Sequence, residues 1–420
     1  MSLSAEEGIE APEAVCALFN DETLRAVLAA LGKEGEETRI VGGAVRDALF
    51  GRPVREIDLA TTLLPHAVMA RVKPAGLRAI PTGLQHGTVT VLAGRRAFEV
   101  TTLREDIATD GRHAEVRFGR DFRVDALRRD FTMNALSAAP SGKLFDYTGG
   151  LADISARKVR FIGEAVRRIK EDYLRILRFF RFSADYGEGP LDREGCSAAI
   201  NQRNGLARLS RERIRAELLK LLCARRAAEV CAEMSASGLL DPLIASAPNP
   251  ARLRRAVVLS EHLPPDPLLR LAALCVALPE DAERLREKLR LSNAETGRLE
   301  KAAQALIGLH GIDAPPSSDE LQLLLFRHGR EAVSDALLLA QADALPGREG
   351  EWARARKFAR ETIIPHLPFT GADMIARGIS EGPAIGEALR ELQTRWIKAG
   401  FPNDPASLAQ LLNDIPRRAK

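Results

Sequence analysis

Two patterns of hydrophobic and polar positions divide the chain. Residues 12–31 carry apolar side chains at helical spacing and stop at Gly32, which predicts a capping helix near the N-terminus. From residue 38 to about residue 146 the apolar runs become short, as in RIVGG, REIDLAT, HGTVTVL and AFEVTTL. Such runs, separated by helical pieces, predict the one sheet of the protein.

Beyond Gly163 almost every segment predicts a helix, for example KEDYLRILRFFRFSADY and EAVSDALLLAQADAL. Prolines cluster at residues 242–250, 264–267 and 365–368, where we expect seams between helical units. Residues 104–123 are polar and charged without a helical or strand period, which predicts a mobile loop. The expected fold class is α+β, with a small mixed sheet followed by an all-helical remainder.

Composition agrees with a mostly helical protein of several units. The chain has 420 residues with 45% hydrophobic side chains, which suits about two to four units of roughly 100 to 200 residues each. Aromatic residues make up 5% while Leu, Ala, Arg and Glu recur, which favours helices over sandwiches or barrels. The formal net charge of +4 allows a nucleic-acid partner without demanding one.

The cysteines and the N-terminal segment indicate a soluble cytoplasmic protein. The five cysteines are scattered and form no CxxC pair, so neither a disulfide framework nor a zinc site is expected. The first residues are acidic where a signal peptide would be basic. No apolar run approaches the ~20 residues that a membrane span needs.

The segment RIVGGAVRD places a glycine pair between a short apolar strand and a helix. A turn at Gly42 and Gly43 would present backbone N–H groups and a helix N-terminus, which bind phosphate oxygens well. Arg46, about one turn into the helix, would add a forked cationic contact to the same phosphates. By itself the glycine pair also fits an ordinary tight turn.

Glu56 and Asp58 flank Ile57, so on a strand both carboxylates would project from one face while Ile57 faces the core. Divalent metal relieves the repulsion, and two Mg²⁺ ions are the usual device for activating a hydroxyl and stabilising a leaving pyrophosphate. Glu99, on a following strand, would complete the metal cage. The alternatives are a solvated strand face for the pair and a water-facing edge strand for Glu99.

Residues 127–138, LRRDFTMNALSA, predict a helix that Arg128 and Arg129 open. Arg129 would reach a triphosphate, Asp130 would accept from a ribose hydroxyl, and Asn134 would share the face of Asp130. The alternative is a capped amphipathic helix with surface salt bridges.

A further helix, predicted over residues 171–182, carries a polar row of Asp172, Arg175, Arg178 and Arg181. Rigidly held Asp and Arg side chains can match the donors and acceptors of a base edge. Protein, and not a nucleic-acid template, would then choose the nucleotide. The arginine row equally fits a solvated or RNA-facing stripe.

Together these segments resemble the class II tRNA nucleotidyltransferases, or CCA-adding enzymes, and their sister family, the bacterial poly(A) polymerases. The resemblance runs through VGGAVRD, REIDLATT, FEVTTLR, ALRRDFTMNAL, FDYTGGLADI, KEDYLRILRFFRF and LSRERIRAELLK. It implies a head of polymerase-β type, a neck with a nucleotide-selecting helix, and a helical body and tail. The implied bounds are 1–33 for the capping helix, 34–155 for the head, 156–245 for the neck, 246–350 for the body and 351–420 for the tail.

The same resemblance assigns roles residue by residue. It makes Glu56 and Asp58 the metal-binding catalytic pair and Glu99 the third catalytic acid. Nucleotide contacts fall on Gly42, Gly43, Arg46, Arg129, Asp130, Asp172, Arg175, Arg178 and Arg181. The family usually has Asp-x-Asp where this chain has Glu56, so slower chemistry or an altered metal preference is expected.

The implied reaction is template-independent addition of CMP, CMP and AMP to the 3′ end of tRNA, using ATP and CTP, with Mg²⁺ as cofactor and release of pyrophosphate. A poly(A) polymerase, or an enzyme that adds part of CCA, is the alternative within this class. A non-catalytic RNA-binding paralogue is the alternative of another class, motivated by Glu56. No membrane partner is expected, and the sequence leaves a monomer and a homodimer open.

Overall fold

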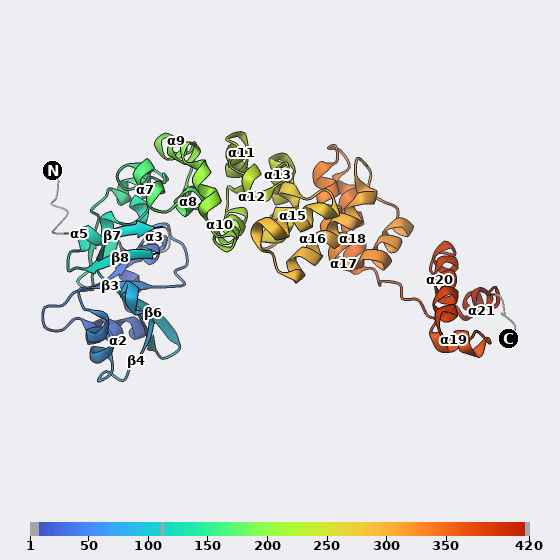
Figure 1. The fold of residues 1–420 in the computed structure, drawn as a ribbon, viewed down its shortest axis with the longest axis horizontal. Coiled ribbons are helices and arrows are strands. Elements are labelled where there is room, and N and C mark those ends of the chain that lie inside the picture. Colours follow the sequence, from blue (N-terminus) through green and yellow to red (C-terminus); the bar gives the residue numbers. More distant parts are fainter. Residues whose placement is uncertain (1–7, 111–112, 416–420) are drawn as a thin grey trace. The chain divides into compact units, whose positions relative to one another are not determined.

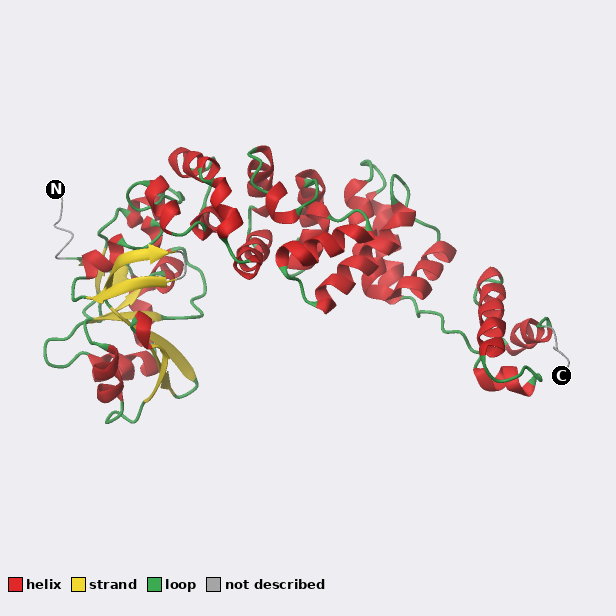
Figure 2. Cartoon of the chain, in the orientation of Figure 1, coloured by secondary structure: helices red, strands yellow, loops and turns green. Residues whose placement is uncertain are grey.

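The computed structural model describes residues 8–110 and 113–415. Its contacts divide the chain into two compact units, one ending at Leu239 and the other beginning at Leu240. The first unit holds all the described strands, which are yellow in Figure 2, together with a set of helices. The second unit is built from helices alone over its described residues (Figure 1).

The main sheet of the first unit has eight strands in the order β1-β10-β9-β2-β3-β6-β5-β4. β3 and β6 run parallel, and the other neighbours in this sheet pair antiparallel. The strands are β1 (Ile9–Glu10), β2 (Thr38–Val41), β3 (Asp58–Thr61), β4 (Arg78–Gly83), β5 (Thr88–Ala93), β6 (Arg96–Thr102), β9 (Ser137–Ala138) and β10 (Lys143–Phe145). The predicted small mixed sheet is confirmed. It also contains β1, which lies outside residues 38–146, where the sheet was predicted.

Apolar side chains of the central strands form the core of this unit. The side chains of Ile40, Leu59, Val89, Val91 and Val100 are fully buried. Helices α2 and α4 pack against each other and against β5, which covers one face of the sheet. On β5 buried and partly exposed side chains alternate, so a one-residue slip would move Val89 and Val91 to the less buried face, and this alternation fixes the register of the strand.

The N-terminal segment is not the single helix that its apolar spacing predicted. α1 (Glu13–Cys16) and the 3-10 helix η1 (Ala17–Asn20) precede α2 (Glu22–Leu31), and the break falls at Asp21. The Asp21 carboxylate accepts hydrogen bonds from two backbone N–H groups of the following turn. A side-chain cap of this kind starts a new helix, which apolar periodicity alone does not reveal.

Two paired strands, over residues 104–110 and 113–118, lie where we expected a mobile loop. β7 (Arg104–Asp110) and β8 (His113–Phe118) pair antiparallel, with a register shift between Asp106 and Ala108. The short helix α5 (Phe122–Leu127) follows. These strands are rich in charged residues and carry no regular apolar alternation, so periodicity gave no strand signal.

Helices at the end of the first unit pack around α8, which contacts α7, α10, α11 and η4. Four aromatic rings, of Phe131, Phe161, Phe179 and Phe182, join α8 to the segment that follows α5, with ring centroids 4.9–6.5 Å apart. The unit's other described helices are α3 (Gly43–Leu49), α4 (Pro65–Val72), η2 (Leu84–His86), η3 (Thr132–Asn134), α6 (Gly150–Ser155), α7 (Ala165–Glu171), α8 (Leu174–Tyr186), α9 (Arg193–Asn201), η4 (Arg203–Arg208), α10 (Arg211–Cys223) and α11 (Ala227–Ala236).

The second unit is helical over its described residues, as predicted. Its helices are α12 (Asp241–Ile244), α13 (Pro250–Leu259), α14 (Pro267–Cys275), α15 (Pro279–Leu289), α16 (Asn293–Leu306), η5 (Ile307–Leu309), α17 (Ser318–Asp343), α18 (Glu349–Glu361), α19 (Gly371–Ala376), α20 (Pro383–Lys398) and α21 (Pro405–Asn413). Met374, Leu392 and Ile415 form part of a separate small core among the last of these helices. Within residues 8–110 and 113–415, no helix combines the length and apolar character needed to cross a membrane.

Candidate active site

The predicted glycine turn joins β2 to α3. Gly42 has φ of 68°, in the region that favours glycine, and it is the N-cap of α3. A Cβ atom on Gly42 would lie 2.8 Å from Nη1 of Arg129, and one on Gly43 would lie 3.5 Å from Nη2 of Arg46. The turn therefore needs a residue without a side chain at position 42, and two arginines border it. This arrangement suits an anionic ligand at the helix start.

Arg46 is held on several sides although it faces the cavity beside the turn. Its Nη1 donates to the amide oxygen of Asn134 at 2.7 Å, and its Nε donates to Asp47 at 2.9 Å. The guanidinium carbon lies 4.3 Å from the ring centroid of Tyr186. These contacts place the side chain in one orientation before any ligand arrives.

The acidic residues lie on two neighbouring strands. Asp58 begins β3, and in the parallel register its partner on β6 is Glu99. Ile57 is 5% exposed between the exposed residues Glu56 and Asp58, as the predicted alternation requires, although Glu56 precedes the strand. β6 lies between β3 and β5, so the alternative was wrong to place Glu99 on an edge strand, although the Glu99 side chain is exposed as that alternative expected.

The Asp58 carboxyl is electrostatically unusual. Burial raises its pKa, and the negative charges of Glu99 and Glu56 raise it further, against the opposing charge of Arg129. A cluster of carboxylates that disfavours its own ionisation is a natural place for a cation. Among the described residues, no three acidic, histidine or cysteine side chains stand close enough together to hold a metal ion by themselves.

The segment after α5 differs from its prediction. Arg128 caps the C-terminal end of α5 and does not open a new helix, and Thr132–Asn134 form the 3-10 helix η3. Backbone bonds of Thr132 with Arg160 and of Ile162 with Asp130 hold this segment beside the neck. The tertiary pairing overrides the local helical spacing.

Asp125 fixes both arginines of this segment, and it was not among the predicted site residues. One of its oxygens accepts from Arg128 at 2.6 Å and the other from Arg129 at 3.2 Å. Burial alone would raise the pKa of Asp125, but the charges of Arg129 and Arg128 outweigh it and lower the pKa. Its spacing of three and four residues from the arginines was the available sequence signal.

Asp130 is enclosed by donors. Its Oδ1 accepts from the Phe131 N–H at 2.8 Å and from the Asn134 side-chain amide at 3.0 Å, and its Oδ2 accepts from Arg178 Nε at 2.7 Å. Burial would raise the pKa of Asp130, but the Arg178 charge and these hydrogen bonds lower it. A ribose hydroxyl would have to take an acceptor position that protein donors hold in this structure.

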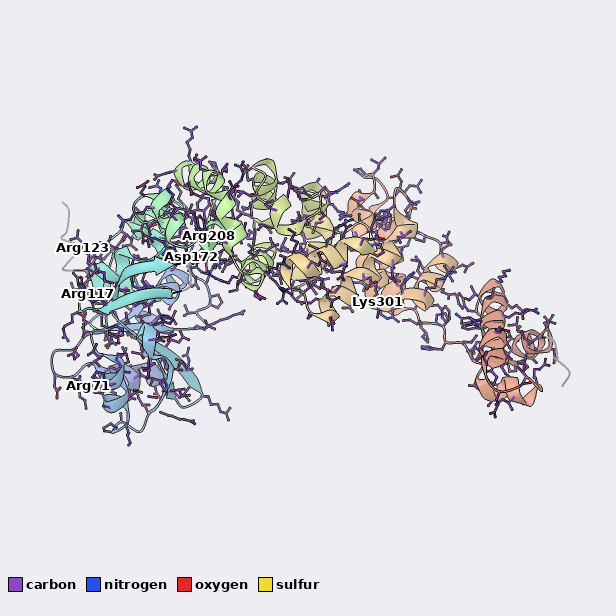
Figure 3. All side chains as sticks on the ribbon, in the orientation of Figure 1. Arg71, Arg117, Arg123, Asp172, Arg208 and Lys301 are labelled. Atoms are coloured by element: carbon purple, nitrogen blue, oxygen red, sulfur yellow. The ribbon has the colours of Figure 1, made fainter. Side chains whose placement is uncertain are left out.

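The predicted helix over residues 171–182 is broken at its start. α7 ends at Glu171, Asp172 has extended backbone, and α8 begins at Leu174. The Asp172 carboxylate accepts a hydrogen bond from the Leu174 N–H, at the start of the new helix, at 3.0 Å, and it also accepts one from Arg213 at 2.6 Å. Figure 3 shows Asp172 with its side chain beside the neck helices.

The arginines of α8 have separate partners. Arg175 donates to Glu171 at 2.6 Å and to the carbonyl of Arg168 at 2.8 Å. Arg181 pairs with buried Glu217 and does not line the cavity, unlike Arg175 and Arg178. The row predicted from periodicity therefore divides into two cavity-facing arginines and one that joins α8 to α10.

Most of the candidate residues surround one cavity of about 430 Å³. Its lining includes the glycine turn, Asp58 and the predicted arginines and aspartates: Gly42, Gly43, Arg46, Asp58, Arg129, Asp130, Asp172, Arg175 and Arg178. Glu99 lines an adjoining cavity of about 200 Å³ that shares Asp58 and Arg129 with the first. Arg104 and Arg128 line both and were not among the predicted site residues. The volume and the cationic lining suit a nucleotide.

Two family models match the chain. Residues 38–160 match the poly A polymerase head domain, and residues 192–249 match a region described as the probable RNA and SrmB-binding site of polymerase A. The first match covers every strand of the main sheet except β1, together with the glycine turn, and the second covers α9 to α12.

Named relatives align over most of their length. The chain is 36% identical to CCA tRNA nucleotidyltransferase 1, mitochondrial, of Mus musculus over 392 residues, covering 90% of this chain and 87% of the relative. It is 34% identical to the CCA-adding enzyme of Geobacillus stearothermophilus, covering 90% and 93%.

Solved structures show the same fold. The CCA-adding enzyme of Bacillus stearothermophilus in complex with CTP aligns with a TM-score of 0.71 and 27% identity, covering 94% of this chain and 98% of that one. The Thermotoga maritima CCA-adding enzyme complexed with tRNA aligns with a TM-score of 0.67 at 20% identity, covering 97% of each chain.

Proposed function

The chain belongs to the CCA tRNA nucleotidyltransferases, and from this membership we propose that it adds CMP, CMP and AMP to the 3′ end of tRNA. CTP and ATP are the nucleotide substrates, and each addition releases pyrophosphate. The observation that carries the proposal is the single cavity that joins a phosphate-binding turn, an acidic strand end and an Asp–Arg pair from the neck.

The fold agrees with this assignment. A mixed sheet followed by helices is the predicted α+β class, and the head is of the polymerase-β type that the family shares. The predicted enzyme class, a nucleotidyltransferase, is confirmed by the relatives.

The glycine turn and two arginines would bind the triphosphate. Gly42 and Gly43, at the start of α3, line the cavity together with Arg46 and Arg129, and the start of a helix suits phosphate oxygens. Both arginines are held by protein partners, Asn134 and Asp125, so little side-chain freedom is lost on binding. The α-phosphate would then lie toward the acidic strand end at Asp58.

Asp172 and Arg175 would read the base. Both side chains line the cavity and both are held from behind, Asp172 by Arg213 and Arg175 by Glu171. A carboxylate and a guanidinium together offer acceptors and donors in fixed positions, which is what discrimination between base edges needs. We assign Arg178 to orienting Asp130, and Arg181 to the packing of α8 on α10.

The bond changes follow from this placement. The terminal 3′ hydroxyl of the RNA gives up its proton to solvent and its oxygen bonds to the α-phosphorus. The bond from the α-phosphorus to the bridging oxygen breaks, and pyrophosphate leaves. The cationic side chains at the turn stabilise the charge that accumulates on the leaving group.

The residues at the acidic strand end fit Mg²⁺. Asp58 and Glu99 offer carboxylate oxygens from paired positions on parallel strands, and burial together with the charges of Glu99 and Glu56 raises the pKa of Asp58. Mg²⁺ is usually held by one or two carboxylates and completed by substrate phosphates. We propose that Glu56 and Asp58 hold the metal with help from Glu99. Bound there, Mg²⁺ would activate the hydroxyl and stabilise the pyrophosphate.

Two further proposals concern the product of the reaction and the cellular compartment. The relatives' names favour complete CCA addition over poly(A) synthesis or partial addition, although the head model carries a poly A polymerase description. The scattered cysteines without a CxxC pair favour a reducing compartment, and we propose the cytoplasm.

An extension assay tests the function. A tRNA that ends before CCA is incubated with Mg²⁺ and either CTP plus ATP or ATP alone, using the wild type and the variant Asp58→Asn. We expect three added nucleotides with the mixture, no long tail with ATP alone, and at least a roughly hundredfold slower rate in the variant, which is about 2.7 kcal/mol of barrier. Long A tails would establish the poly(A) alternative, and a fully active Asp58→Asn would remove the proposed metal pair.

A further inference from the structure

The last residue of α8 is hydrogen-bonded to the helix that follows the glycine turn. The Tyr186 hydroxyl donates to Oδ1 of Asp47, on α3, at 2.8 Å. Arg52, just beyond α3, donates to the backbone carbonyl of Asp185. These contacts join the head to the C-terminal end of α8, whereas Arg175 and Arg178 line the cavity nearer its other end. None of Tyr186, Asp47 or Arg52 lines the cavity.

The same oxygen of Asp47 that receives the Tyr186 hydroxyl also holds Arg46. Arg46 Nε lies 2.9 Å from Oδ1 of Asp47, and Arg46 Nη2 lies 2.8 Å from it. The Tyr186 hydroxyl therefore limits the positions that the carboxylate can take, and the carboxylate in turn limits the guanidinium. Two of the five guanidinium N–H groups are used in this way.

The Tyr186 ring gives Arg46 a second support. The Arg46 guanidinium carbon lies 4.3 Å from the ring centroid, within the range of a cation–π contact. The ring is 7% exposed and is packed by Phe50 at 5.1 Å and Phe182 at 5.6 Å between centroids. Its position is thus fixed by packing from both α3 and α8.

Chemistry agrees with a donor role for the hydroxyl. Burial raises the pKa of Tyr186, and the negative charge of Asp47 raises it as well, while Arg46 opposes them. The Tyr186 hydroxyl therefore stays protonated at neutral pH and donates a hydrogen bond to the Asp47 carboxylate. A tyrosine whose only task was to fill space would not need this bond, since phenylalanine has the same ring.

On the far side of the guanidinium, Asn134 links Arg46 to the other cavity-facing groups. The Asn134 amide oxygen accepts from Arg46, and its amide nitrogen donates to Asp130, which holds Arg178 of α8. The chain of bonds leaves α8 at Tyr186, crosses α3, and returns to α8 at Arg178. Arg46 is the member of this loop that borders the glycine turn.

We propose that Tyr186 and Asp47 are positioning residues that hold Arg46 in its triphosphate-binding orientation and tie that orientation to the nucleotide-selecting helix α8. The proposal rests on the function proposed above. Because Arg46 would contact phosphates and not bases, the effect of the Tyr186 hydroxyl must be the same for CTP and ATP. It must also fall on nucleotide binding before it falls on the chemical step.

The test removes one hydroxyl. In Tyr186→Phe the ring packing remains, and we expect the KM for CTP and the KM for ATP to rise together by about three- to tenfold, the range for one lost hydrogen bond. The value of kcat stays within about twofold, because the acidic residues are untouched. If Tyr186 had only a structural role, Tyr186→Phe would lower the melting temperature but would not raise KM while leaving kcat nearly unchanged.

Tyr147→Phe is the matched control. The Tyr147 hydroxyl also takes part in a side-chain hydrogen bond, here as the acceptor from Arg39 Nη1 at 3.1 Å, but neither Tyr147 nor Arg39 lines the cavity. We expect Tyr147→Phe to leave both KM values at the wild-type level. Comparable melting temperatures for the two variants would show that any difference in KM does not come from general loosening.

A double-mutant cycle locates the effect in the proposed pair. Asp47→Asn is expected to raise both KM values more than Tyr186→Phe does, and the double variant is expected to match Asp47→Asn within about twofold. KM increases that multiply in the double variant would show that Tyr186 does not act through Asp47, and would overturn the proposal.

The outcomes separate this inference from the proposed function. Wild-type protein that adds no nucleotide to tRNA overturns both. Active wild type with Tyr186→Phe indistinguishable from Tyr147→Phe overturns the positioning role alone, and so does a KM change confined to one of the two nucleotides.

Discussion

Three carboxylates near Arg129 differ in the direction of their pKa shifts because of their nearest partners. Burial and neighbouring acids raise the pKa of Asp58, whereas arginines outweigh burial and lower the pKa values of Asp125 and Asp130. The first carboxylate is thus suited to a cation from outside. The other two are already satisfied by protein, and serve to fix Arg128, Arg129 and Arg178.

Asp125→Asn tests that structural role through pH. Since the folded pKa of Asp125 is lowered, its stabilising effect is complete above the unfolded value of about 3.9 and is lost as pH falls through the lower folded value. At pH 7 we expect the variant to lose about 1–3 kcal/mol, because two arginines lose a charged acceptor. Urea unfolding from pH 7 to pH 3 measures the difference. It should shrink below pH 4; a difference that stays constant with pH would contradict this account.

Glu56, one of the proposed metal-binding residues, stands where the family resemblance leads us to expect an aspartate. In Glu56→Asp we expect addition to continue within about tenfold of the wild-type rate, with a lower ratio of the Mn²⁺-supported to the Mg²⁺-supported rate, because the shorter arm suits a smaller, stricter ion. Glu56→Gln keeps the length but removes the charge, and should slow addition roughly hundredfold. Equal rates for wild type, Glu56→Asp and Glu56→Gln would show that this residue holds no metal.

The sequence predicted candidate site residues whose positions follow from the local geometry of a turn, a helix or a strand. Gly42, Arg46 and Asp58 could be chosen because a turn, a helix and a strand each place the next side chain at a known spacing. Arg213 could not be chosen in this way, since its importance depends on a tertiary contact with Asp172. Asp125 is different, because it lies three and four residues before Arg128 and Arg129 and its spacing was a local signal that the prediction did not use.

At the scale of elements, the start of α8 depends on a close contact with η4. A Cβ atom on Gly205 of η4 would overlap the ring of Tyr173, which immediately follows the base-reading candidate Asp172. Glycine at this position lets η4 approach the beginning of α8. The approach helps to set where Asp172 lies.

Gly205→Ala tests this contact. The added methyl group must displace the Tyr173 ring, and we expect the free energy of unfolding to fall by about 1–3 kcal/mol. We also expect the variant to add UMP or GMP to tRNA more often than the wild type does. Gly297→Ala in α16 is the control: nothing lies within 4 Å of its Cβ position, so alanine should stabilise by about 0.5–1 kcal/mol. Thermal unfolding and misincorporation assays check both. Unchanged stability and selectivity in Gly205→Ala would remove this role for the contact.

The sequence predicted a helix end correctly where a glycine stands at the end of the apolar pattern. It missed boundaries that depend on polar side chains or on tertiary contacts. Gly32 ended its helix as expected. The break at Asp172 and the end of α5 at Arg128 were missed, because the apolar spacing continues through both positions. In the structure the helix nevertheless stops at each of them, where Asp172 and Arg128 make polar contacts. The hairpin of β7 and β8 was missed because its charged strands lack an apolar alternation.

At the scale of the whole molecule, the proposed nucleotide site lies within the unit that ends at Leu239. A ligand that binds only the folded state of this unit stabilises it by about 2.7 kcal/mol at a concentration of 100 times its Kd. Calorimetry of the full chain should therefore show a CTP-dependent rise in one unfolding transition, with the transition of the other unit unchanged. Equal shifts of all transitions would contradict the placement of the site in one unit.

The most direct measurement of the central claim uses three tRNAs, truncated before the first C, before the second C and before the final A, each offered CTP or ATP separately. The account predicts that the first two accept CMP, that the third accepts AMP, and that addition stops once CCA is complete. Addition of AMP to all three without a stop, or of no nucleotide to any of them while the tRNA still binds, would contradict it.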